Sequence, residues 1–508
     1  MLLAEPALIA TIAWLPVDDL PSGMWANFWA NVWSWQGLLV AFAIVGEILA
    51  VMFVYRVLVR GGSAASTLLW MVFILATPWL GLMFYYLLPR TLQLRRLRRT
   101  QQSERRLREV RPLDDGNPEP PKPTSGLDRL LQCRGGLSEG NALRWLPGGE
   151  DFFAAASAAI GKAEQHVHCV VYILRPDSTG LRFLELLTEA ATRGVKVRLC
   201  FDSVGSWGLK TAHLRPLRAA GGQAVPFLPL LWKRRPFTLN LRNHRKLLVV
   251  DGSVAFLGGR NIADEYRHDR VGKRRRWYDA MMEVRGPAVD WLQDVFVQDW
   301  CTAADEVLPE ELAGGTSRSP CDPAGTCRVG IVSSGPDDVP SALSFALFQA
   351  IGEAHTTITL SSPYLVMPPT LQFALQLAVA RGVKVRIYTN GPCAEAAFLY
   401  HAQRHHYRQL LESGLELYET IKEYNHTKFL VVDDSTVCIG SANLDLRSAN
   451  LNFELAAVAL NAEPLAAAIQ ATVEQRQACF HQVTPESLPS NPFWRAIDGG
   501  CALFSPLL

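Results

Sequence analysis

The 508-residue sequence contains no CxxC pair and no cluster of Cys and His residues with the spacing of a metal site. Its ten cysteines are scattered, and most lie within apolar strand-like or helix-like segments, which favours buried, reduced thiols in a reducing compartment. Cys321 and Cys327 share a loop, but no neighbouring Cys or His completes a metal site there. The sequence therefore predicts neither a metal nor a cofactor.

An excess of charge of one sign is also missing. The chain has 50 Lys and Arg against 48 Asp and Glu, a net charge of +2, so it is not a polycation suited to non-specific nucleic-acid binding. Residues 1–36 contain no Lys or Arg, which excludes a secretory signal, because such a signal begins with a basic region. The same residues are rich in tryptophan, which favours a segment lying in the membrane interface.

Two long apolar runs do occur, at 37–58 and 67–88. Each is long enough to cross ~30 Å of hydrocarbon, so we predict two transmembrane helices. Glu47 is the one acidic residue in the first run, and we expect it to be protonated or to pack against the second helix. Pro78 is expected to kink the second run, with Thr77 satisfying the backbone groups that the proline frees.

An arginine-rich run from Arg90 to Arg111 follows the second apolar run. By the positive-inside rule this run predicts that the large C-terminal portion faces the cytoplasm. Each cation near the membrane surface also contributes ~1 kcal/mol of binding free energy to anionic headgroups. Residues 89–125 as a whole are interpreted as a basic and Pro-rich linker, and 311–327 as a second linker. These linkers bound two domains, 126–310 and 328–508.

The two domains repeat each other. AIGKA at Ala159 recurs as AIGEA at Ala350, and RGVKVR at Arg193 recurs unchanged at Arg381. HRKLLVVDG at His244 recurs as HTKFLVVDD at His426. Three matches in one order indicate a duplicated domain. Within the first copy we expect, in turn, a helix, a strand, a helix and a strand over Asp151–Ala163, His168–Leu174, Leu181–Thr192 and Val195–Phe201. This alternation is typical of an α/β fold with a mixed sheet in each half.

Each half carries one copy of a polar motif. Its members are His244, Lys246, Asp251, Gly258, Gly259 and Asn261 in the first half, and His426, Lys428, Asp433, Gly440, Ser441 and Asn443 in the second. In a strand, residues i and i+2 share a face, so each His projects beside its Lys. The imidazole can act as nucleophile or general acid, and the ammonium can hold a phosphate. A lone HxK is usually an exposed polar face, but six matching positions in both halves favour chemistry.

These paired motifs resemble the HKD motifs of the phospholipase D superfamily, and the wider sequence resembles bacterial cardiolipin synthases of the two-span type. The supporting stretches are Asn240–Lys246, Gly258–Tyr266, Ser362–Tyr364, Gly440–Ser448, Leu451–Glu454 and Ser505–Leu508. Thr427 departs from the Ala usual between His and Lys. The resemblance implies two phospholipase D-like α/β/α sandwich halves that form a pseudo-dimer with one shared active site, preceded by two transmembrane helices.

The resemblance also implies a metal-free, two-step displacement that condenses two phosphatidylglycerol molecules into cardiolipin and glycerol. It assigns His244 as the nucleophile that becomes phosphatidylated and His426 as the acid and base. The lysines Lys246 and Lys428 and the asparagines Asn261 and Asn443 would hold the phosphate, while Glu454 and Asp279 would each orient one histidine. Asp251 and Asp433 belong to the motif, and structural contacts are the role we expect for them.

The alternatives are hydrolytic phospholipase D activity and transfer with another donor or acceptor, because the motif chemistry is common to all three. The expected partners are phospholipids and the membrane, without nucleic acid. The expected location is the bacterial inner membrane, as a multi-pass protein with its catalytic halves in the cytoplasm.

Overall fold

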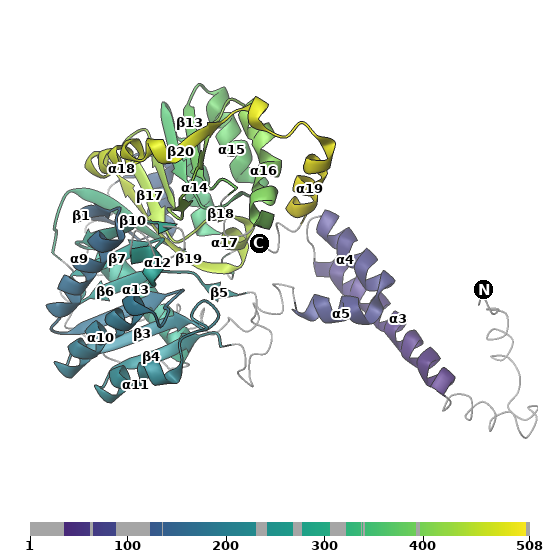
Figure 1. The fold of residues 1–508 in the computed structure, drawn as a ribbon, viewed down its shortest axis with the longest axis horizontal. Helices are drawn as coiled ribbons and strands as arrows, with labels where there is room; N and C mark the ends of the chain where they lie inside the picture. The colour runs from purple at the N-terminus through teal and green to yellow at the C-terminus, as the bar shows by residue number, and fades with distance from the viewer. Residues whose placement is uncertain are drawn as a thin grey trace, which may run out of the picture. The chain divides into compact units, whose positions relative to one another are not determined.

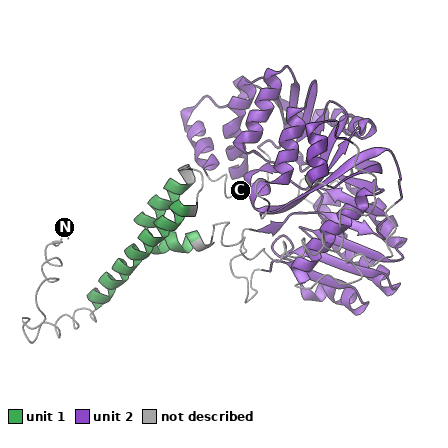
Figure 2. Ribbon diagram, turned by 180° about the vertical axis from the view of Figure 1, so that it is seen from behind, with its two compact units in different colours: residues 1–89 green, residues 90–508 purple. Residues whose placement is uncertain are grey.

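A computed structural model describes residues 35–60, 64–87, 122–134, 136–229, 241–267, 277–304, 322–336, 338, 341–392 and 397–503. The chain divides into two compact units, Met1–Pro89 and Arg90–Leu508 (Figure 2). All but the last two residues of the predicted interfacial segment 1–36, nearly all of the linker 89–125 and most of the linker 311–327 lie outside the described residues.

The first unit contains three apolar helices, α3 (Trp35–Arg60), α4 (Ala64–Ala76) and α5 (Pro78–Leu87). Within the described residues, Gly37–Val59 is the one helix long and apolar enough to cross a membrane. The second run was expected to be a kinked helix and is instead two shorter ones, because Pro78 cannot donate a backbone hydrogen bond and ends the first of them. The Thr77 hydroxyl donates to the carbonyl of Phe73 at 2.9 Å, in the supporting role expected of it.

The three helices pack through a small core of Ala50, Phe53, Val57, Ile74, Leu82 and Tyr85. Gly46 permits a close approach to Trp79, since a Cβ there would lie 2.7 Å from the indole Nε1. Glu47 is exposed on α3, so of the two expected outcomes the packing against the second helix does not occur, and protonation stays a prediction. Most of the surface of α3 is apolar and exposed, which suits a lipid environment better than water.

The second unit is built on one continuous 16-stranded sheet (Figure 1). The first half contributes β1 (Leu137–Leu146), β2 (His166–Val171), β3 (Lys196–Asp202), β4 (Gln223–Phe227), β6 (Leu247–Val250), β7 (Val254–Gly258) and β9 (Met281–Arg285). The second half contributes β10 (Cys327–Ser334), β11 (Thr357–Ser361), β13 (Lys384–Thr389), β14 (Glu416–Thr420), β16 (Phe429–Val432), β17 (Thr436–Gly440), β19 (Asn452–Leu460) and β20 (Phe480–Val483). A short strand, β5 (Arg242–Asn243), also pairs with β19.

The strand order shows the duplication. Outward from β1 the first half runs β9, β7, β6, β2, β3 and β4, and outward from β10 the second half runs β19, β17, β16, β11, β13 and β14. The two halves join where β1 and β10 pair antiparallel. Within each half the strands β2, β3 and β4, or β11, β13 and β14, are parallel and the others antiparallel, so the predicted mixed sheet is confirmed.

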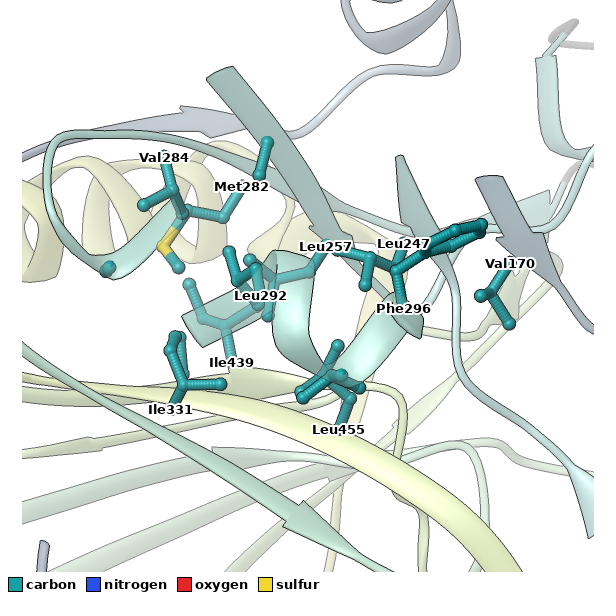
Figure 3. Close-up of a cluster of buried hydrophobic side chains, with 14 of the residues drawn as sticks. Val170, Leu247, Leu257, Met282, Val284, Leu292, Phe296, Ile331, Ile439 and Leu455 are labelled. Atoms are coloured by element: carbon teal, nitrogen blue, oxygen red, sulfur yellow. The ribbon is translucent and has the colours of Figure 1, made fainter. Parts of the chain in front are cut away.

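Helices cover the sheet and enclose three apolar cores. The outer core of the first half lies under α9 (Gly149–Gly161), α10 (Ser178–Thr192) and α11 (Thr211–Ala219), and that of the second half under α8 (Gly126–Arg134), α14 (Ala342–Gly352), α15 (Pro369–Ala380) and α16 (Ala397–Glu412). A central core around α13 (Ala288–Ala304) and α18 (Glu463–Gln475) combines side chains of both halves, including Leu257 and Ile439 (Figure 3). This shared core fixes the position of the first half relative to the second half of this unit.

The expected elements of the first copy are present with ends shifted by a few residues, as α9, β2, α10 and β3. Strands β6 and β7 are buried along their whole length, as their near-continuous apolar sequences predict. The eight cysteines among the described residues are all free thiols, and four of them are buried: Cys169, Cys200, Cys301 and Cys438.

Candidate active site

The two motif histidines are each attached to the backbone of the opposite half. His244 directly follows β5, which pairs in parallel with β19, and its amide donates to the Phe453 carbonyl at 3.0 Å. His426 directly follows β15 (Tyr424–Asn425), which pairs in parallel with β8 (Trp277–Tyr278), and its amide donates to the Tyr278 carbonyl at 2.7 Å. The two short ladders therefore fix both histidines at the junction of the halves.

The carboxylates that meet these histidines are also exchanged between the halves. Nδ1 of His244 lies 3.0 and 3.1 Å from the two carboxylate oxygens of Glu454, and Nδ1 of His426 lies 2.6 Å from Oδ2 of Asp279. Donation from each Nδ1–H to a carboxylate selects one tautomer and leaves the Nε2 lone pair free. Both carboxylates are completely buried. The structure thus brings together the two histidines and the two acidic residues that the sequence singled out.

Asp279 and Glu454 occupy equivalent positions, two residues before the residues that pair with Gly258 and Gly440. The side chain of Glu454 is longer than that of Asp279 by one methylene, and the motif residue beside each carboxylate differs to match this length. A Cβ on Gly259 would lie 2.4 Å from Oδ1 of Asp279, so only glycine fits beside that carboxylate. In the second half the same position is Ser441, and its hydroxyl donates to Glu454. The difference between GG and GS in the two motifs therefore follows from the carboxylate that each one contacts.

Each motif lysine folds back over its own histidine. Nζ of Lys246 donates to the His244 carbonyl at 2.6 Å, and Nζ of Lys428 donates to the His426 carbonyl at 2.5 Å. Nζ of Lys428 also lies 4.0 Å from Oδ2 of Asp279. These residues precede strands β6 and β16 rather than lying within them. Two buried ammonium groups next to two imidazoles form a site suited to a phosphate anion.

Burial and charge together set the protonation of the site. Burial lowers the pKa of His244 to about 4, against the opposing effect of Glu454, and burial together with Lys428 lowers the pKa of His426 to about 3. Burial alone would raise the pKa of Glu454, but His244 and Lys246 outweigh it and hold that pKa at about 2. Both imidazoles are therefore neutral near pH 7, which is the form required of a nucleophile or a base.

Burial lowers the pKa of Lys428 to about 8 and that of Lys246 well below its ordinary value. We therefore expect kcat/KM to fall as pH rises through about 8, because a deprotonated lysine no longer attracts phosphate. The measurement is a pH profile with substrate phosphodiesters, which do not titrate in this range. A bound phosphate favours the ammonium, so the profile of kcat should show its alkaline fall at higher pH. A kcat/KM that stays flat to pH 10 would contradict this electrostatic account.

The two motif asparagines are not equivalent. Oδ1 of Asn261 accepts from the Ile173 amide at 3.1 Å and its Nδ2 donates to the Tyr266 hydroxyl at 2.8 Å, which leaves one N–H for a substrate. The backbone amide of Asn443 donates to the Ser448 hydroxyl at 3.2 Å. Phosphate binding by Asn261 and Asn443 remains a prediction, with Asn261 also holding the loop after β2.

Asp251 and Asp433 lie at the far ends of β6 and β16 from the histidines. The Asp251 carboxylate accepts from the backbone amides of residues 164, 165 and 166 at 2.8–2.9 Å, and Asp433 accepts from those of residues 355, 356 and 357 at 2.7–3.0 Å. Burial opposes ionisation, but these amides outweigh it and hold the pKa of Asp433 below its usual value. The geometry of both aspartates is structural, and neither faces the reacting groups.

Replacing Asp251 with Ala is expected to lower the free energy of unfolding by about 2 kcal/mol, because three amides lose a charged acceptor. The kcat of the folded enzyme should change by no more than about twofold, since the carboxylate is remote from the histidines. Denaturant unfolding and turnover of the detergent-purified chain measure the two effects. Glu164→Ala, which keeps its backbone amide, is the control. A large loss of kcat with unchanged stability would assign Asp251 a catalytic role.

Aromatic residues around the histidines were not assigned a role from the sequence. The Tyr172 ring meets the His244 ring edge-on at 4.9 Å between centroids, and Nζ of Lys246 lies 5.2 Å from the same ring. Trp277 and Tyr266 lie 5.4 and 5.5 Å from the ring of His426. Tyr172 directly follows the parallel strand β2, and ligands bind at the carboxyl ends of such strands, so its position in the repeat was the available signal.

Comparison with known proteins agrees with this geometry. Residues 157–300 and 347–477 match the family model described as "Cardiolipin synthase, PLD-like domain". The cardiolipin synthase of Halalkalibacterium halodurans is 30% identical over 490 residues, covering 93% of this chain and 95% of that protein. The cardiolipin synthase of Geobacillus thermodenitrificans is 34% identical over 439 residues, covering 83% of this chain and 85% of that protein.

Among solved structures, a phosphatidylserine synthase of Haemophilus influenzae matches with a TM-score of 0.58 at 14% identity, covering 75% of this chain and 97% of that one. This likeness supports the fold. The duplicated sheet and the paired motifs define an enzyme of the phospholipase D class. Within that class, the chain belongs to the cardiolipin synthase family, as the resemblance of its motifs implied.

Proposed function

We propose that the enzyme transfers a phosphatidyl group from one phosphatidylglycerol to the hydroxyl of a second, forming cardiolipin and releasing glycerol. The observation that carries this proposal is the pair of neutral imidazoles, each held by a carboxylate of the opposite half and flanked by a buried lysine. Such a pair can supply a nucleophile on one side of a phosphorus and a proton carrier on the other.

In the first step Nε2 of His244 attacks the donor phosphorus. A P–N bond forms, the P–O bond to glycerol breaks, and His426 gives its proton to the departing oxygen. His426 is neutral in the empty site, and the negative phosphodiester favours its protonated form on binding. Lys246 and Lys428 offset the charge that gathers on the phosphoryl oxygens.

In the second step His426, now neutral, takes the proton from the acceptor hydroxyl. The acceptor oxygen forms a P–O bond, the P–N bond to His244 breaks, and His426 is again protonated for the next cycle. Glu454 stabilises positive charge on His244 while it carries the phosphatidyl group. The order of roles follows the family resemblance, since the geometry of the two histidines is close to symmetric.

The test is product analysis with purified full-length enzyme and phosphatidylglycerol in mixed micelles. We expect cardiolipin and glycerol in equal amounts, and a phosphatidyl group on the peptide that contains His244 after rapid denaturation at neutral pH, because acid cleaves a P–N bond to histidine. Phosphatidic acid as the main product would indicate hydrolysis instead. Efficient incorporation of another alcohol in preference to phosphatidylglycerol would redefine the acceptor.

We infer that the enzyme is a multi-pass protein of the bacterial inner membrane, with α3 crossing once and α4 with α5 crossing back. The exposed apolar surface of α3 and the combined apolar length of α4 and α5 support this arrangement. The arginine run from Arg90 to Arg111 then keeps the catalytic halves in the cytoplasm, because its translocation would oppose the membrane potential at ~2.3 kcal/mol per charge per 100 mV.

A C-terminal fluorescent fusion that requires cytoplasmic folding is therefore expected to be bright, and a C-terminal alkaline phosphatase fusion to be inactive. Replacing the arginines of 90–111 with glutamine should weaken this orientation. The opposite pair of fusion results would place the catalytic halves outside the cytoplasm.

A further inference from the structure

A pocket separate from the motif histidines lies on the second half, between α16 and the helix α19 (Pro492–Ala502), which Figure 1 shows beside each other. Its volume is about 420 Å³, within the range of small-ligand sites. None of the motif residues lines it. Arginines dominate its polar lining: Arg404 and Arg408 come from α16, and Arg495 comes from α19.

The charge of the pocket favours an anion. Asp498 is its one acidic lining residue, and its carboxylate is already engaged by Arg404 through two hydrogen bonds of 2.8 Å and by Nδ1 of His401 at 2.8 Å. Arg408 and Arg495 make no ion pair within the part of the chain that the structure describes. Two guanidinium groups without a counter-charge therefore border one concave surface, an arrangement suited to a phosphate.

Large aromatic side chains are exposed beside this pocket. Phe493 is 64% exposed and Trp494 is 43% exposed, both in the first turn of α19. The Trp494 ring stacks on His401 at 5.8 Å between centroids, which fixes its position relative to the arginines. Exposed aromatics next to cations are typical of protein surfaces that enter the headgroup layer of a bilayer. A soluble phosphate would gain nothing from them, so the pattern favours a lipid.

The helix α16 that lines the pocket is linked to the active site by hydrogen bonds, because the Gln403 side-chain amide donates to the Asn390 carbonyl at 2.6 Å. Asn390 directly follows β13, and its Nδ2 donates to the carbonyl of Asn425, the residue before His426. Helix α16 begins a few residues later, and Arg404 lies about 10 Å along it from Ala397. The pocket and His426 thus belong to the same half of the catalytic unit.

We propose that this pocket binds the phosphate of an anionic phospholipid, independently of catalysis, and holds the catalytic unit against the bilayer surface. Arg408 and Arg495 bind the phosphate, and Phe493 and Trp494 enter the interface beside it. Zwitterionic phosphatidylcholine is disfavoured, since its choline cation meets a positively charged surface.

The test counts the lipids retained by full-length protein purified in detergent and exposed to phosphatidylglycerol or phosphatidylcholine, by native mass spectrometry. The double variant Arg408→Glu, Arg495→Glu should retain one phosphatidylglycerol fewer than the wild type, with about a tenfold loss of occupancy. The double variant Lys162→Glu, Arg215→Glu, at two exposed positions of the first half, is the matched control with the same charge change and should retain the wild-type number.

The neutral variant Arg408→Gln, Arg495→Gln guards against misfolding caused by charge reversal and should show the same loss. Equal phosphatidylglycerol occupancy in the variants and the wild type would overturn the proposal. So would equal retention of phosphatidylcholine, or displacement of the lipid by inorganic phosphate at the same concentration, which would indicate a site for soluble anions. The count is repeated with all variants in the His244→Ala background, where phosphatidylglycerol is not consumed, so its outcome is independent of the proposed reaction.

Discussion

Replacing either His244 or His426 with Ala is expected to reduce cardiolipin formation by about 10⁴-fold or more, because residues that act as one catalytic unit lose most of their effect together. The two imidazoles serve one phosphorus, one as nucleophile and one as proton carrier, so neither can replace the other. The double variant should be at most about tenfold slower than the slower of the two single variants. Turnover of labelled phosphatidylglycerol by the purified full-length variants measures these losses.

His355→Ala is the matched control, since that side chain is exposed and only its backbone amide is used, by Asp433. Its activity should equal that of the wild type. Mixing the two inactive single variants should not restore turnover, because each site is completed within one chain. A single variant that keeps more than about a tenth of wild-type activity would show that the two motifs do not share one site.

Replacing Glu454 with Gln or Asp279 with Asn is expected to lower kcat by about a thousandfold, with little change in KM, since the carboxylate charge matters most when its histidine becomes positive. The acidic group of each pair raises the pKa of its histidine. Its removal therefore lowers that pKa further, and the imidazole becomes harder to protonate or to phosphatidylate. Steady-state kinetics and the pH dependence of kcat test both statements.

Ser441→Gly is the graded control for the Glu454 side, because it removes one hydrogen bond to the carboxylate and recreates the GG of the first motif. We expect a loss of about tenfold or less, in line with the effect of a residue that orients a catalytic group. If Glu454→Gln were no worse than Ser441→Gly, the carboxylate would be a structural contact and not a charge partner of His244.

Much of this architecture can be predicted from the sequence, because it depends on local residue patterns. Repeats that start at Ala159 and Ala350 identify the duplication, and the alternation of helices with apolar strands predicts the mixed sheet. The break at Pro78 follows from one missing amide hydrogen. These features depend on residues close together in the chain, or on patterns that repeat along it.

The exchange of carboxylates between the halves could not be predicted in the same way. It depends on the pairing of β5 with β19 and of β8 with β15, and each pairing joins residues of different halves. Nothing in the sequence around Glu454 specifies that it meets His244 rather than the histidine of its own half. The use of Asn261 to hold the Ile173 amide was likewise hidden, because the partner is a backbone group with no sequence signature.

The pairing of His244 with Glu454 across 210 residues, and of His426 with Asp279 across 147, has a consequence for biosynthesis. Chains emerge from the ribosome N-terminus first, so the apolar N-terminal helices and the whole first half exist before β19 has been made. During that interval His244 has no carboxylate, and its lysine and aromatic neighbours surround an incomplete centre. A nascent or truncated chain that ends before β19 is therefore expected to be chemically silent, and lipid transfer can begin only when synthesis is nearly finished.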